Sequence, residues 1–145
     1  MPILAFIFGF FAATAALLVQ VLASIFIATP LIGTPSLLLL IGAATIEESA
    51  KLLFLIQLGR RSVTTVPFLG AFIFGVGFVV TEIALLALSA KSLPTLTDLG
   101  SIVVVQIIGA LVIYGGLRMK EFSPLSWLFG LLAAVLIHTL YNSSL

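Results

Sequence analysis

Five long apolar runs constrain this chain more than any other feature of its sequence. A helix needs about 20 mostly apolar residues to cross the roughly 30 Å hydrocarbon core of a bilayer. We predict spans at about residues 3–28, 35–58, 66–90, 97–117 and 124–142. The connections between them are short, which favours antiparallel neighbours. The expected fold is therefore an all-α, polytopic membrane helical bundle, with residues 1–145 forming a single integral membrane domain.

Composition supports a lipid bilayer as the surroundings. Of the 145 residues, 62% are hydrophobic and 8% are charged, whereas soluble domains average about 45–50% apolar and about 25% charged. The net charge of +1, without a basic tail or basic–aromatic pattern, indicates no nucleic-acid partner. The absence of cysteine excludes disulfides, thiolate metal sites and a cysteine nucleophile.

Basic residues predict how the chain is oriented. Arg60, Arg61, Arg118 and Lys120 fall on the side that five spans would assign to the N-terminus, and only Lys91 falls on the other. The positive-inside rule then places the N-terminus in the cytoplasm and the C-terminus outside. The first span has no basic segment before it and is longer than a signal-peptide core, so we expect it to be retained.

Ionisable side chains within the predicted spans point toward function. Glu47, Glu48 and Lys51 lie in the second span, Glu82 in the third, and the single histidine, His138, in the fifth. A charge at the bilayer centre costs about 2.5–3.5 kcal/mol, so these groups should meet one another, or water, inside the bundle. At about 1.5 Å per residue, all of them lie between the midplane and the outer half. We therefore predict a shared polar cavity that opens toward the outer side.

Helical spacing groups these residues into three motifs, each with members on one helix face: Glu47-Glu48-x-x-Lys51, Phe78-x-x-x-Glu82 and His138-x-x-x-Asn142. Lys51 can pair with either glutamate. Adjacent helical residues point about 100° apart, so we expect only one glutamate, Glu48, to face the cavity centre. Structural interpretations stay open: Glu47 and Lys51 as a self-neutralising pair, Glu82 as a partner of His138, and Asn142 as a helix cap.

The combination of carboxylates, a histidine and an amide suits hydrolysis by an activated water. A carboxylate can act as the general base, and His138 and Asn142 can donate hydrogen bonds to the oxyanion formed at a carbonyl. Lys51 would keep one carboxylate ionised and oriented. The alternative is a Zn²⁺ held by Glu48, Glu82 and His138 around a reactive water. A single histidine and no cysteine favour the metal-free version.

These motifs carry a resemblance to a known family. EESAK at 47–51, FVVTE at 78–82 and HTLYN at 138–142 resemble the motif set of PrsW-type intramembrane proteases, relatives of the CAAX prenyl endopeptidase (Abi) superfamily. The resemblance extends from the second span to the C-terminus. The Abi branch would place an arginine one position after Lys51 and a histidine at Glu82, so the likeness is closer to PrsW.

The resemblance implies membrane-embedded proteolysis by Glu47, Glu48, Glu82 and His138, with Asn142 in support. It also implies a prokaryotic cell membrane and a membrane-protein substrate, such as a single-span anti-sigma factor cut on its extracytoplasmic side. Two other functions remain open. The buried acids and histidine could form a relay in a small proton- or cation-coupled transporter, or the motifs could belong to a non-catalytic membrane scaffold.

Overall fold

A computed structural model of the chain describes residues 1–26, 36–61, 67–89 and 95–144. These residues form an all-α bundle, as predicted, with elements α1 (Pro2–Phe26), α2 (Leu37–Arg61), α3 (Phe68–Ser89), α4 (Leu96–Arg118), the 3-10 helix η1 (Met119–Glu121) and α5 (Ser126–Ser143). The described helix ends lie within about one turn of the predicted ones. The predicted ends at residues 28, 35, 66 and 90, and Lys91, lie outside the described residues.

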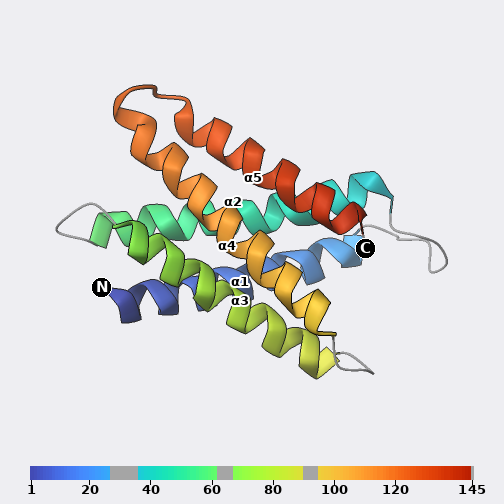
Figure 1. The fold of residues 1–145 in the computed structure, drawn as a ribbon. Coiled ribbons are helices and arrows are strands. Elements are labelled where there is room, and N and C mark those ends of the chain that lie inside the picture. The colour runs from blue at the N-terminus through green and yellow to red at the C-terminus, as the bar shows by residue number, and fades with distance from the viewer. Residues whose placement is uncertain (27–35, 62–66, 90–94, 145) are drawn as a thin grey trace.

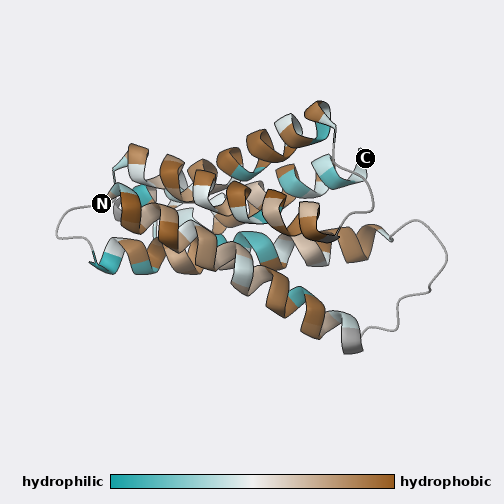
Figure 2. Ribbon diagram, turned by 90° about the horizontal axis from the view of Figure 1, so that it is seen from below, coloured by the Kyte–Doolittle hydropathy of each residue, from teal (hydrophilic) through white to brown (hydrophobic). Residues whose placement is uncertain are grey.

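Four of the described helices, α1, α3, α4 and α5, are long and apolar enough to cross a membrane. Figure 2 shows hydrophobic residues over most of the ribbon, interrupted by short hydrophilic segments. We predicted five such spans. Helix α2 has the length, with 25 residues, but Glu47, Glu48 and Lys51 interrupt its middle and it is not among the four. The chain is an integral membrane protein whose second helix is less apolar than the others.

The order of packing places α2 beside three other helices. Helix α1 packs against α2 and α3, α4 packs against α3 and α5, and α2 also contacts α4 and α5 (Figure 1). The N-terminus, the end of α2 and the turn between α4 and α5 lie at one end of the bundle, on the left of Figure 1. The C-terminal end of α5 and the start of α2 lie at the other. The middle of α2 therefore faces α1 on one side and α4 and α5 on another.

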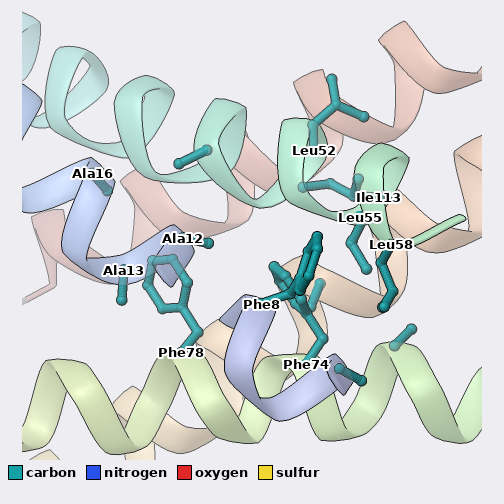
Figure 3. Close-up of a cluster of buried hydrophobic side chains, with 14 of the residues drawn as sticks. Phe8, Ala12, Ala13, Ala16, Leu52, Leu55, Leu58, Phe74, Phe78 and Ile113 are labelled. Carbon is teal, nitrogen blue, oxygen red and sulfur yellow. The ribbon is translucent and has the colours of Figure 1, made fainter. Parts of the chain in front are cut away.

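Close packing of α1 on α3 fixes the apolar wall beside α2. A Cβ atom on Gly9 would overlap the carbonyl oxygen of Phe74, and one on Gly77 would overlap that of Phe6. Small residues of this kind let membrane helices approach closely. Figure 3 shows side chains from four helices meeting in this core: Phe8, Ala12, Ala13, Ala16, Leu52, Leu55, Leu58, Phe74, Phe78 and Ile113.

Candidate functional site

A buried ion pair lies at the centre of the bundle. The Nζ atom of Lys51 is 2.6 Å from Oε1 of Glu48, and both side chains are fully buried. The Nδ1 atom of His138, on α5, is 2.7 Å from the same Glu48 oxygen. Lys51 also donates a hydrogen bond to the side-chain oxygen of Gln106 on α4. We call Glu48, Lys51, Gln106 and His138 the sealed network, because all four side chains are buried.

The positions of these side chains follow from local structure. Glu48 and Lys51 are three residues apart on α2, a spacing that brings helical side chains together. Gly109 of α4 provides the space they occupy, since a Cβ atom there would lie 2.8 Å from Glu48 Oε2 and 3.2 Å from Lys51 Nζ. The ring of Phe78 covers the lysine, with its centroid 4.6 Å from Nζ, a cation–π contact. The ion pair thus packs directly against the α4 backbone and the α3 wall.

Glu47 lies outside the sealed network, on the side of α1, but it contacts two of the network's members. Its carboxylate accepts a hydrogen bond of 2.9 Å from Gln20 of α1 and one of 3.1 Å from the amide of Gln106. The Nε2 atom of His138 is 3.6 Å from Glu47 Oε2, and the Glu47 side chain is 17% exposed. Gln106 contacts Glu47 and Lys51, and His138 contacts Glu48 and lies near Glu47. These two residues therefore connect the side of α2 that faces α1 with the side that faces α4 and α5.

A cavity of about 440 Å³ opens beside Glu47, between α1, α2 and α3. Its polar lining consists of Gln20, Glu47 and Glu82, and alanine and leucine side chains with Phe78 complete it. It extends from the middle of the bundle toward the end where α1 and α3 finish and α2 begins. We call it the carboxylate cavity.

Glu82 lies at the edge of both groups. The charges of Glu47, Lys51 and His138 act on its carboxylate, as does the side chain of Gln106. Its Oε2 atom is buried and has no hydrogen-bond partner among the described residues. Glu48 Oε2 is also buried without one, but it packs against Gly109, whereas the Glu82 carboxyl group lines the cavity. Glu82 is therefore the glutamate that has an unpartnered buried oxygen and whose carboxyl group also borders the cavity.

The structure brings Glu47, Glu48, Lys51, Glu82 and His138 into one cluster. It does not do so for Asn142, which was expected to donate to an oxyanion. Asn142 is one turn beyond His138 on α5, and within the described residues its side chain makes no hydrogen bond to the cluster.

Our expectation that Glu48 faces the cavity was wrong. Glu47 lines it, together with Glu82, and Glu48 does not. The physical reason is the rotation of α2: Lys51 and His138 hold Glu48 on the side of α4 and α5, so Glu47, about 100° further round the helix, is directed toward α1.

Two glutamines were missed by the sequence analysis. Gln20 and Gln106 both donate hydrogen bonds to Glu47. Each is a polar residue inside an apolar run, and this feature of the sequence could have marked them as candidates. A neutral amide is a much weaker signal than a charge, because it is less costly to place in a membrane.

Two of the predicted zinc ligands, Glu48 and His138, contact each other directly, and Lys51 shares the same Glu48 oxygen. Within the described ranges, no three His, Asp or Glu side chains form a group that could hold a metal ion. The ammonium group of Lys51 contacts the same Glu48 oxygen that faces His138. A cation in that position would repel a divalent metal ion. We therefore assign no chemical step to a metal.

Comparison with known proteins adds no relative. No protein-family model, no curated protein and no solved structure matches the chain. The likeness to PrsW-type proteases rests on the segments 47–51, 78–82 and 138–142. Those three segments also supply most of the buried polar cluster.

Proposed function

We propose that the protein is an intramembrane endopeptidase in which Glu82 and Glu47 activate a water molecule in the carboxylate cavity. One observation carries this proposal: the cavity is lined by two carboxylates, and one of them has a buried oxygen without a partner in the described structure. Buried polar atoms are normally hydrogen bonded, so the free oxygen of Glu82 is suited to hold water or substrate.

In the proposed mechanism, each group of the cluster has its own role. Glu82 takes a proton from water, the resulting hydroxide attacks the peptide carbonyl carbon, and the C–N bond breaks as Glu82 returns the proton to the amine. Glu47, held by Gln20 and Gln106, orients the water. His138 is fixed through Nδ1 by Glu48, and its Nε2 atom lies 3.6 Å from Glu47 Oε2. In the proposed mechanism it donates a hydrogen bond from Nε2 to the developing oxyanion.

Two members of the sealed network, Glu48 and Lys51, support this site without lining the cavity. Lys51 neutralises Glu48 at 2.6 Å, and Glu48 in turn holds the ring of His138 at 2.7 Å. Lys51 and Glu48 are therefore positioning residues in this mechanism. Glu82 and Glu47 are the catalytic carboxylates.

The location of the cavity supports a substrate that is itself embedded in the membrane. We infer an orientation with the N-terminus in the cytoplasm and the C-terminus outside, since Arg60, Arg61, Arg118 and Lys120 lie at the N-terminal end of the bundle. The carboxylate cavity then lies in the outer half of the membrane. A single-span protein of a prokaryotic membrane, such as an anti-sigma factor, would be cut on its extracytoplasmic side.

One observation favours a second function, proton transport. Hydrogen-bonded and charged groups continue from Glu47 at the cavity through Gln106 and Lys51 to Glu48 and His138. Chains of buried acids and histidines of this kind carry protons in pumps and transporters. Any test of the protease should therefore measure proton movement as well.

The test compares the wild type with Glu82→Gln in lipid vesicles. The full chain is reconstituted with a library of single-span membrane proteins, and new termini are mapped by mass spectrometry. We expect the variant to lose about 10²–10⁴-fold of the cleavage rate. Asp98→Asn is the matched control. It makes the same carboxylate-to-amide change at the start of α4, where the Asp98 side chain is hydrogen bonded to Thr95, and this variant should cleave normally.

Four outcomes would contradict the proposal or part of it. Equal cleavage by wild type and Glu82→Gln, or no new termini from folded wild type, would contradict the protease. Proton uptake that depends on Glu82 without cleavage would establish the transporter instead. Cleavage that a chelator abolishes and Zn²⁺ restores would replace the metal-free mechanism with a metal-dependent one.

A further inference from the structure

A second pocket, of about 640 Å³, lies between α2, α4 and α5 at the end of the bundle opposite the carboxylate cavity. Three basic residues line it: Arg60 in the last turn of α2, Arg118 at the end of α4, and Lys120 in η1. Within the described side chains, none of them forms an ion pair with a carboxylate. Three cations from separate elements therefore converge on one pocket without a counter-charge from any side chain that the structure describes.

We propose that this basic pocket binds the headgroup of an anionic phospholipid. Basic pockets between membrane helices are suited to acidic lipid headgroups, and charge complementarity favours a phosphate here. The ends of α2 and α4 that border the pocket are C-terminal ends, which carry partial negative charge. The side chains, and not the backbone, must therefore supply the attraction, so binding depends directly on the arginines and the lysine.

The pocket walls select a lipid over a soluble phosphate. Nearer the middle of the bundle than the basic residues, the lining is apolar and includes Leu52, Leu53 and Ile56 of α2. Leu53 is 62% exposed, so this wall continues onto the outer surface of the helix. Tyr114 and Trp127 also line the pocket, and such aromatic side chains favour the level of the headgroups. A charged mouth above an apolar wall matches a phosphate with an attached acyl chain.

Trp127 makes the proposal directly measurable. It is the single tryptophan of the chain and it lines the basic pocket, so its fluorescence reports on whatever occupies that pocket. Bromine atoms on a lipid acyl chain quench tryptophan by contact. The full chain is placed in bilayers that contain a fixed fraction of either dibrominated phosphatidylglycerol or dibrominated phosphatidylcholine, and the quenching of Trp127 is compared.

We expect the brominated anionic lipid to quench Trp127 at a lower fraction than the zwitterionic one, by about fivefold or more. Each nearby basic residue contributes about fivefold to the attraction of an anionic lipid, so Arg118→Gln should reduce the preference by about that factor. Arg61→Gln is the matched control. Arg61 is exposed at the same end of α2, but its guanidinium stacks on Phe8 at 5.5 Å and it does not line the pocket, so the preference should survive.

Each other result would overturn the proposal. Equal quenching by the two lipids would show that the pocket does not select charge. An equal loss in Arg61→Gln and Arg118→Gln would show a general surface attraction and no defined site. Relief of the quenching by millimolar inorganic phosphate would make the ligand a soluble anion. Unchanged Trp127 emission of each variant in unbrominated lipid checks that the pocket is folded.

Discussion

Glu47 and Glu48 are neighbours in the chain but belong to two regions that are built differently. Glu48 lies in the sealed network, fully buried, with Lys51 and His138 on one carboxylate oxygen. Glu47 lines the carboxylate cavity with Glu82 and is partly exposed. Each region contains one buried glutamate oxygen without a partner in the described structure, so a missing hydrogen bond does not distinguish them.

The difference lies in what surrounds the free oxygen. In the sealed network it packs against Gly109, where no molecule has room to bind. In the carboxylate cavity, Glu82 borders a space of about 440 Å³. In the proposed mechanism, the same residue type therefore serves as part of a support in one region and as a reactive group in the other. This contrast predicts that changes in the sealed network cause the largest losses of stability, and that changes of the cavity carboxylates lower the proposed activity with little loss of stability.

The largest effect on stability is expected from Lys51→Met. Removing one partner of a buried ion pair leaves an uncompensated charge and costs about 3–5 kcal/mol. The free energy of unfolding in mixed micelles, measured by titration with a denaturing detergent, gives the value. The double variant Lys51→Met with Glu48→Gln removes both charges and should recover part of the loss. A single-variant loss below about 1 kcal/mol, typical of an exposed pair, would contradict a sealed network.

A smaller loss is expected from Gly109→Ala. The added methyl group would meet Glu48 Oε2 at 2.8 Å and Lys51 Nζ at 3.2 Å, and overpacking of this kind costs about 1–3 kcal/mol. Gly115→Ala is the control on the same helix, since a Cβ atom there meets nothing within 4 Å. It should gain about 0.5–1 kcal/mol, the usual advantage of alanine in a helix. Equal effects at both glycines would show that the ion pair is not packed against α4.

The smallest loss of unfolding free energy is expected at the carboxylate cavity. Gln20→Leu removes a donor to Glu47, but water in the cavity can replace it, so the loss of unfolding free energy should be about 1 kcal/mol or less. Gln106→Leu also removes a donor to Glu47 and in addition an acceptor of Lys51. It should cost more, about 1.5–3 kcal/mol for hydrogen bonds to charged groups. If the two variants were equally stable, the two regions would not differ as described.

Much of the fold was predictable from the sequence because apolar runs of membrane length leave few alternatives. The helices begin and end within about one turn of the predicted positions where they are described. The grouping of Glu47, Glu48, Lys51, Glu82 and His138 was also predictable, since charges inside a membrane have to find one another. Both inferences rest on the free-energy cost of placing a residue in the membrane, which depends on the residue type and its depth.

The rotation of α2 was not predictable in the same way. The charges in the middle of α2, at positions 47, 48 and 51, do not all lie on a single face of the helix, so the pattern does not say which glutamate faces α1. That choice is made by contacts with His138 and Gly109 from other helices. The role of Gln106 has the same origin, because its two hydrogen bonds join α4 to α2 across the bundle.

The contrast between the two regions is tested most directly by chemical access to the carboxylates. The full chain in lipid vesicles is treated with a membrane-permeant carbodiimide, and the modified residues are located by peptide fragmentation, with Asp98 at the start of α4 as the positive control. We expect adducts on Glu82 and Glu47, which line the cavity, and none on Glu48, which is fully buried. Modification of Glu48 as readily as Glu82 would contradict the separation of a sealed network from an open, reactive cavity.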